Sequence, residues 1–188
     1  MFIFLIFQWF LVIVLLVILV LLFMWAWTIV FSRVPFFLIP NSILKDIEKI
    51  LELRNDSVLY NLGCGDGGTL FYLSKNNPKA KYIGIEGNTF PYFLLRMKLL
   101  YSKKFSKSKL EIINKNFSNC DLSEATHVLM YLYPNIMDDL LPKLENELKQ
   151  GTRLVSVSFK FTGKKPIFEI DLNRSKYKLA RKIYVYEF

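Results

Sequence analysis

The feature that most constrains this chain is a cluster of four glycines within residues 63–68, directly after a short apolar run, Val58–Leu62. Apolar residues at helical spacing, Leu70, Phe71 and Leu73, follow the cluster at once. This order predicts a strand, a tight turn and a helix. Glycines at such a junction accept positive φ angles and let a ligand approach the backbone N–H groups that open the helix. We therefore expect a cradle for a nucleotide-type cofactor.

A long apolar segment begins the chain. The first 32 residues carry no charged side chain, and this run exceeds the roughly 20 residues that cross a bilayer. Trp9 lies about one hydrocarbon thickness of helix before Trp25 and Trp27, as interfacial anchors do. The alternative, a cleaved signal peptide, would need a basic leader and a small-residue cleavage site. We therefore expect one retained transmembrane helix over residues 1–31.

Charge is confined to the part of the chain after this helix. The formal net charge of +9 belongs wholly to the segment that begins at Arg33. The positive-inside rule then predicts a single-pass topology with the N-terminus outside and the domain in the cytoplasm. A basic domain beside an anchor favours the lipid bilayer as its partner over nucleic acid or an acidic protein.

A linker over residues 32–42 is expected between the anchor and a domain over residues 43–188. Pro35 and Pro40 prevent a simple continuation of the helix, and Asn41 or Ser42 is expected to cap a new helix. The core face of that helix consists of Ile43, Leu44, Ile47, Ile50 and Leu51. The apolar linker either packs on the domain, lies at the lipid surface or forms a flap over the cofactor.

Strand and helix patterns alternate through the rest of the chain. Further strands are expected at residues 81–86, 110–114, 125–131 and 153–161, with helices at 90–101 and from Pro134 to about 149. Two last β segments, at 167–172 and 182–188, have no helical pattern between them. The order predicts an α/β fold with a parallel sheet, helices on both faces and an antiparallel terminal hairpin. The basic spacer at 103–109 is either a solvated loop or a contact for lipid headgroups.

Glu86 ends the second expected strand, roughly 20 residues beyond the glycines, where an acid can accept both hydroxyls of a ribose. The spacing Gly63-x-Gly65-x-x-Gly68 also matches the dinucleotide fingerprint. A dehydrogenase, however, needs substrate-binding elements beyond its nucleotide half. Only about 100 residues remain after Glu86, and they complete one sheet. Length therefore argues against a dehydrogenase.

The pattern Asn61-x-Gly63-x-Gly65-x-Gly67 instead resembles class I methyltransferases that bind S-adenosylmethionine. Nearly the whole chain after the anchor is similar to a small family of protein lysine methyltransferases. That family includes an archaeal broad-specificity enzyme and membrane-anchored mitochondrial enzymes that modify the adenine nucleotide translocase and the ATP synthase c-subunit. The segments that carry the resemblance are residues 60–67, 83–88, 121–126, 131–134, 141–148 and 151–156.

The resemblance implies a Rossmann-like, seven-stranded class I methyltransferase sheet with a C-terminal antiparallel hairpin, and S-adenosylmethionine as cofactor. It also implies a mitochondrial membrane as the location if the source is eukaryotic. The positions that it assigns to cofactor binding are Asn61, Gly63, Cys64, Gly65, Asp66, Gly67, Glu86, Asn88, Asn116 and Phe117. Three residues depart from the family's usual pattern: Asn61 and Asn116 each stand in place of Asp, and Gly68 replaces a frequent Arg. These departures concern efficient catalysis more than cofactor binding.

Methyl transfer requires an aligned, neutral nucleophile more than it requires a catalytic base. Tyr131, Tyr133 and the carbonyl before Pro134 follow the fourth expected strand and are the candidates for holding a substrate amine. The expected substrate is a protein with an accessible lysine, in or beside the membrane. A lipid or quinone methyltransferase, or a weakly active cofactor-binding interaction module, remain alternatives.

The remaining reactive side chains give no sign of a metal site. Cys64, Cys120 and His127 are the two cysteines and the one histidine, and they show no metal-ligand spacing. In a domain that faces the cytosol, the cysteines are expected to be free thiols. His127 lies on an apolar segment and is expected to be a packed side chain rather than a base.

Overall fold

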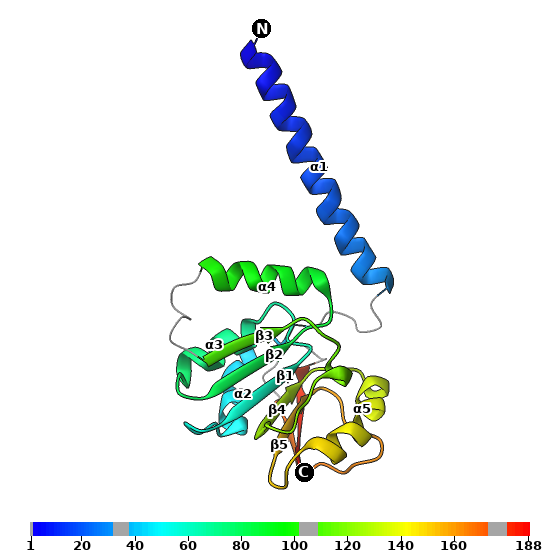
Figure 1. The fold of residues 1–188 in the computed structure, drawn as a ribbon. Coiled ribbons are helices and arrows are strands. Elements are labelled where there is room, and N and C mark those ends of the chain that lie inside the picture. The colour runs from blue at the N-terminus through cyan, green and yellow to red at the C-terminus, as the bar shows by residue number, and fades with distance from the viewer. Residues whose placement is uncertain (1, 32–37, 102–108, 173–179) are drawn as a thin grey trace. The chain divides into compact units, whose positions relative to one another are not determined.

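The computed structural model describes residues 2–31, 38–101, 109–172 and 180–188 (Figure 1). The chain forms two compact units, Met1–Pro35 and Phe36–Phe188. Most of the predicted linker, at 32–37, and most of the basic spacer, at 102–108, lie outside the described residues.

The first unit is a single helix, α1 (Phe2–Phe31). Its stretch Phe4–Ala26 is long and apolar enough to cross a membrane, and none of it is buried against protein. This finding rests on length and composition.

The second unit is built on a seven-stranded sheet with the order β3-β2-β1-β4-β5-β7-β6. The strands are β1 (Val58–Leu62), β2 (Lys81–Ile85), β3 (Lys109–Ile113), β4 (His127–Met130), β5 (Arg153–Val157), β6 (Phe168–Asp171) and β7 (Lys182–Glu187). The first five run parallel, and β7 pairs antiparallel with both β5 and β6. The predicted class I methyltransferase sheet with a terminal antiparallel hairpin is therefore confirmed.

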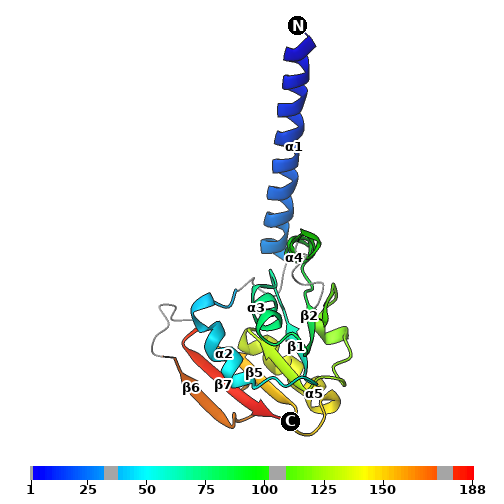
Figure 2. The same ribbon diagram turned by 90° about the vertical axis from the view of Figure 1, so that its left-hand side faces the viewer.

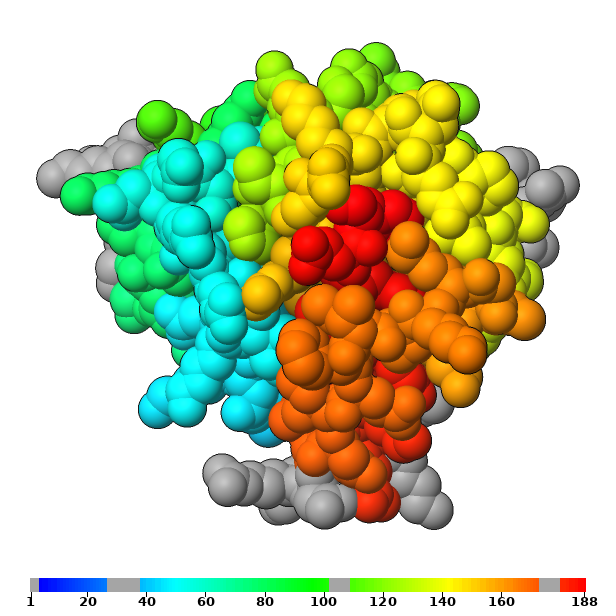
Figure 3. All heavy atoms as spheres, turned by 90° about the horizontal axis from the view of Figure 1, so that it is seen from below, coloured from blue at the N-terminus to red at the C-terminus, as the bar shows by residue number. Residues whose placement is uncertain are grey.

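Helices cover both faces of this sheet. They are α2 (Leu44–Leu51), α3 (Gly68–Asn76), α4 (Thr89–Tyr101) and α5 (Pro134–Glu147). Figures 1 and 2 show α2 and α3 on one face of the sheet and α5 on the other. Helix α4 lies across one end of the domain, at the top of both views. The end of the domain opposite α4 carries the β6–β7 hairpin between α2 and α5 (Figure 3).

The central strands have the burial expected of a covered parallel sheet. Four of the five residues in each of β1, β2 and β5 are buried, which explains their nearly continuous apolar sequences. In the register, Leu62 is paired with both Ile85 and Met130. The carboxyl ends of β1, β2 and β4 therefore meet at one edge, where parallel sheets bind ligands.

The start of α2 differs from the prediction. Neither Asn41 nor Ser42 caps the helix with its side chain; a 3-10 turn, η1 (Asn41–Ile43), leads into it instead. Pro40 fixes φ at −62°, and its carbonyl accepts the N–H of Ile43 at 3.1 Å. Because this backbone bond closes the turn, no side-chain cap is needed.

Two strands are shorter than expected. β4 covers His127–Met130, and β5 ends at Val157. The next residue after β5, Ser158, has a φ of +71°. This left-handed conformation turns the chain out of the strand direction, so the apolar residues as far as Phe161 form a loop.

Candidate active site

The glycine turn has the backbone conformation that its sequence predicts. Gly63, Gly65 and Gly67 have φ angles of +72°, +58° and +74°, which residues with a Cβ rarely adopt. The N–H groups of Gly63 and Cys64 both donate to the carbonyl of Ile85, at 2.9 and 3.0 Å. The turn is thereby fixed to the end of β2.

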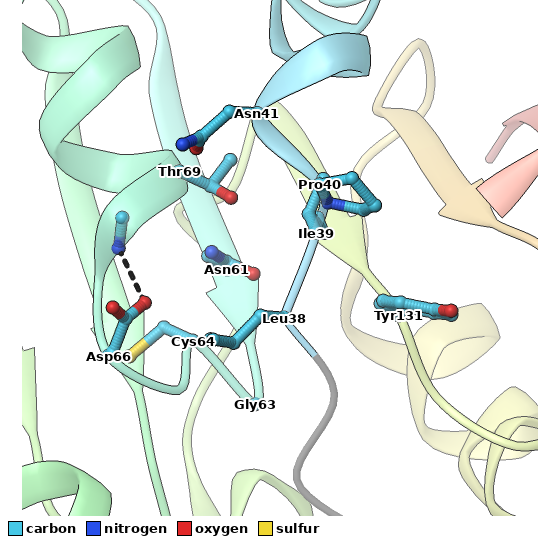
Figure 4. Close-up of a pocket in the computed structure, with 11 residues that line it drawn as sticks. Leu38, Ile39, Pro40, Asn41, Asn61, Gly63, Cys64, Asp66, Thr69 and Tyr131 are labelled. Atoms are coloured by element: carbon cyan, nitrogen blue, oxygen red, sulfur yellow. Dashed lines mark hydrogen bonds between the residues drawn. The ribbon is translucent and has the colours of Figure 1, made fainter. Parts of the chain in front are cut away.

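Helix α4 packs closely over this turn. A Cβ built at Gly67 would lie 2.3 Å from Leu95 Cδ1, so any side chain here would force Leu95 to shift. The φ of +74° at Gly67 also favours glycine. On the same side, Lys98 Nζ lies 2.6 Å from Asp66 Oδ2. Asp66 Oδ1 also accepts the N–H of Gly68 at 3.0 Å (Figure 4). Asp66 thus connects the first residue of α3 to α4.

Glu86 is a buried carboxylate beside the turn, with 5% of its surface exposed. Its Oε2 accepts the N–H of Gly65 and its Oε1 accepts the N–H of Asn88, each at 2.8 Å. Within the described part of the chain, no cationic side chain forms an ion pair with it. Burial raises the pKa of this carboxyl, and the amide hydrogen bonds from Asn88 and Gly65 partly offset the rise. Each oxygen keeps a lone pair for a further donor.

A pocket of about 300 Å³ lies beside the glycine turn (Figure 4), a volume typical of small-molecule sites. Its walls come from the end of β1, the turn, the start of α3, the chain after β4 and residues 38–41. The predicted site residues among its lining are Asn61, Gly63, Cys64, Asp66 and Tyr131. The described part of the linker therefore lines the pocket beside the glycine turn.

Asn116 and Phe117, two of the predicted cofactor-binding residues, lie after β3, next to the loop that follows Glu86. Asn116 Oδ1 accepts the N–H of Ser118 at 2.9 Å and so begins a 3-10 turn, η3 (Phe117–Asn119). A Cβ at Gly87 would lie 3.8 Å from Asn116 Cα. Phe117 is buried. These residues adjoin the Glu86 group but do not line the pocket itself.

The candidate substrate-contacting residues come directly after β4. Tyr131 is buried and lines the pocket, whereas Tyr133 is half-buried. The ring of Phe159, from the loop after β5, lies 6.2 Å from that of Tyr131 and 5.3 Å from that of Tyr133. The carbonyl before Pro134 accepts the N–H of Met137 at 3.0 Å. One of its lone pairs is therefore used by the first turn of α5.

Sequence reasoning missed several residues of this region. Phe159 belongs to a stretch that resembled the end of a strand, and its contact with the tyrosines arises only from the pairing of β4 with β5. Ser158 beside it has a buried hydroxyl without a hydrogen-bond partner among the described residues. Asn114 donates its side-chain amide to the carbonyl of Glu86 at 2.8 Å. A polar residue at the end of a strand was the available signal for Asn114.

Of the two cysteines and the histidine, Cys64 lines the pocket, whereas Cys120 and His127 do not. Cys64 and Cys120 are both free thiols, as predicted, and both are buried. Burial raises the pKa of the Cys64 thiol, which therefore stays protonated near the pocket. His127 opens β4, at the opposite end of the strand from Tyr131. Burial lowers its pKa, and its Nδ1 lies 2.8 Å from Thr126 Oγ1.

These residues fit the cofactor that the glycine pattern implies. Each carboxylate oxygen of the buried Glu86 accepts one backbone N–H and keeps a lone pair, as a carboxylate that accepts two ribose hydroxyls would need. The glycines leave the backbone of the turn free of side chains, and a pocket adjoins it. Together the sheet order and this site define a class I methyltransferase that uses S-adenosylmethionine.

Solved structures with the same fold support this class. An RNA methyltransferase from Salinibacter ruber, solved with S-adenosyl-L-homocysteine, matches with a TM-score of 0.71 and 24% identity over 80% of this chain and 93% of its own. Precorrin-6y C5,15-methyltransferase from Geobacter metallireducens matches with a TM-score of 0.58 and 14% identity, over 79% of this chain and 87% of its own. At these sequence identities the structural similarity shows a shared fold and nothing more specific.

Sequence comparison identifies the family. Residues 61–168 match the ANTKMT methyltransferase domain. A protein-lysine N-methyltransferase from Saccharolobus islandicus is 36% identical over 135 residues, which make up 71% of this chain and 82% of the relative. The chain therefore belongs to the ANTKMT methyltransferase domain family, and the resemblance drawn from its motifs is confirmed.

Proposed function

We propose that this chain is a membrane-anchored protein lysine N-methyltransferase whose substrate is a protein in or beside the membrane. The observation that carries the proposal is the composition of the pocket. Its walls combine the glycine turn with residues 38–41. In the sequence these residues follow the membrane-length stretch Phe4–Ala26, and even a fully extended chain between Ala26 and Leu38 would span only about 40 Å. The relative from Saccharolobus islandicus, a protein-lysine N-methyltransferase, supports lysine as the acceptor.

The residues around the pocket suit an amine substrate. S-adenosylmethionine supplies an activated methyl group on a sulfonium. A lysine amine, with an ordinary pKa of about 10.4, has to lose its proton before its lone pair can form the new N–C bond. Tyr131 lines the pocket, and the ring of Phe159 lies near the rings of Tyr131 and Tyr133. In this proposal these aromatic side chains exclude water from the amine, and desolvation lowers the pKa of an ammonium. The ammonium first loses its proton to solvent, and the phenol oxygens then orient the neutral amine toward the methyl group. The S–CH3 bond would break as the N–CH3 bond forms, and S-adenosyl-L-homocysteine would be the leaving group.

The proposed topology follows from charge. The uncharged α1 crosses the membrane, the N-terminus lies outside, and the basic domain lies on the cytoplasmic side. The 23-residue stretch Phe4–Ala26 supports a single crossing.

A transfer assay tests the proposal. The full chain in native membranes receives S-adenosylmethionine with a radiolabelled methyl group, and protein and lipid fractions are then separated and counted. We expect label in the protein fraction, recovered as methyllysine after acid hydrolysis. Label in lipid alone would instead favour the lipid methyltransferase, for which Leu38 and Ile39 in the pocket wall are equally suitable. Measurable cofactor binding without any label would favour the interaction module.

A matched pair of variants tests the role of the tyrosines. Tyr131→Phe keeps the ring and removes the phenol oxygen, and we expect the rate to fall at least about tenfold, the loss of one oriented hydrogen bond. Tyr184→Phe is the control, because Tyr184 is similarly buried but lies on β7. Equal rates for both variants would remove Tyr131 from the substrate site.

A further inference from the structure

Helix α4 has two apolar faces, and only one of them is packed. Leu95 and Pro91 are buried against the domain. On the other side, Phe93, Leu94, Leu100 and Tyr101 are 48%, 39%, 72% and 82% exposed. A helix that covers a soluble protein normally presents polar residues on its outer side.

The exposed apolar residues form one continuous stripe. At 3.6 residues per turn, six positions fall within an arc of about 120° on the side of the helix away from Leu95. They are Phe90, Phe93, Leu94, Met97, Leu100 and Tyr101, here called the outer face of α4. Phe90 and Met97 are half-buried, and the rest are exposed. Contiguous apolar surface of this kind marks a site of interaction.

Charge around the outer face selects its partner. Between Glu86 and Glu111 the sequence contains six basic residues and no acidic residue. Arg96 lies on one flank of the stripe and is exposed, whereas Lys98 on the other flank is ion-paired with Asp66. An apolar stripe with aromatic side chains and a basic flank is the pattern of a helix that lies in the interface of an anionic bilayer. A second copy of this chain would instead bring two basic surfaces together.

We propose that the outer face of α4 docks the domain on the surface of an anionic lipid bilayer. This inference rests on the proposed membrane association of the chain and adds a second, peripheral contact to the anchor. Residues 38–41 and the glycine turn line one pocket, and α4 packs directly on that turn through Leu95 and Lys98. Residues 38–41 therefore lie beside the same glycine turn on which α4 packs.

Docking of α4 on the bilayer would restrict where the acceptor lysine of the substrate can lie relative to the membrane. Asp66, which lines the pocket, is held by Lys98 of α4. With α4 in the interface, the pocket lies about one helix diameter, or roughly 10 Å, from the headgroups. The acceptor lysine would then lie within a few residues of a membrane-embedded or membrane-bound segment of the substrate.

The depth of single labelled positions tests the docking. The full chain carries Phe93→Cys with an environment-sensitive fluorophore and is reconstituted into vesicles of phosphatidylcholine, with or without phosphatidylserine. The introduced thiol is the accessible one, because both native cysteines are buried. Phe168→Cys is the matched control, since Phe168 is also an exposed phenylalanine, at 61%, and it lies on β6. Strand β6 is at the end of the domain away from α4 (Figures 2 and 3).

We expect spin-labelled lipids to quench the label at position 93 several-fold more strongly than the label at position 168, and more strongly in the anionic vesicles. Leu100→Cys, at the other end of the outer face, should behave like Phe93→Cys. Equal quenching at positions 93 and 168, or a label at 93 that stays in water in both vesicles, would overturn the docking. Resistance to alkaline extraction reports insertion of α1 separately. A chain that resists extraction without quenching at 93 would therefore refute the docking and leave the anchor intact.

Discussion

At the scale of single residues, Glu86 is the most informative position. A buried carboxylate without a cation is costly to a folded protein, and the amides of Gly65 and Asn88 offset only part of that cost. A ligand that donates two hydroxyls would complete its hydrogen bonds. The position is therefore better explained by binding than by stability.

Glu86→Gln should weaken cofactor binding while the fold persists. The substitution keeps the size of the side chain and removes the charge, so we expect a loss of about 1 to 3 kcal/mol in binding free energy, typical of a charge-assisted hydrogen bond. Isothermal titration with S-adenosyl-L-homocysteine measures it. Glu111→Gln is the control, because Glu111 is exposed on the neighbouring β3. An affinity unchanged by Glu86→Gln would exclude the ribose role.

The same carboxyl predicts how binding depends on pH. Burial raises the Glu86 pKa above its ordinary 4.5, and the ionised form is the one that accepts two hydroxyls. Affinity should therefore be constant near neutral pH and should fall as pH decreases, beginning at a higher pH than an exposed glutamate would give. The Glu86→Gln protein should lack this dependence. Identical pH profiles for the two proteins would show that another group controls it.

At the scale of elements, the sequence predicted most where the cause is local. The bounds of β1 were predicted correctly, because an apolar run meets glycines that require positive φ. The end of β5 and the uncapped start of α2 were not predicted correctly. Backbone conformation there is set by the left-handed Ser158 and by Pro40 rather than by periodicity.

Contacts between elements explain what else the sequence left open. Phe159 meets Tyr131 and Tyr133 only through strand pairing, which no local pattern encodes. In α4, apolar residues occupy nearly the whole circumference, so helical periodicity does not say which side is inward. Packing against Gly67 decides it, and leaves Leu94 outside.

Helix α2 should contribute to stability through one side chain in particular. Ile47 is fully buried, and the helix is also tied to β5 by a 2.9 Å hydrogen bond from Arg153 to the carbonyl of Ile50. We expect Ile47→Ala to lower the free energy of unfolding by about 2 to 5 kcal/mol. Lys45→Ala, at an exposed position of the same helix, should change it by less than about 0.5 kcal/mol.

Urea unfolding followed by far-ultraviolet circular dichroism compares the two variants. Tryptophan fluorescence is unsuitable, because all three tryptophans lie in α1. Equal losses in the two variants would mean that α2 is not a cooperative part of the domain.

At the scale of the whole molecule, the chain separates its two kinds of surface. The apolar α1 carries no charge, and the part of the chain that begins at Arg33 carries the entire net charge of +9. An integral helix and a basic surface hold a protein at a membrane by different physics. Hydrophobic insertion is insensitive to salt, whereas attraction to anionic headgroups is screened over about 3 Å at 1 M salt.

This difference predicts the behaviour of a chain shortened to begin at Arg33. At low salt it should sediment with anionic membranes through the outer face of α4 and its basic flank, and at high salt without detergent it should move to the supernatant. The full chain should stay in the pellet under both conditions. Immunodetection of each fraction measures the distribution. A shortened chain that only detergent releases would mean that a second apolar segment inserts after α1, and a full chain that salt alone releases would mean that α1 is not an anchor.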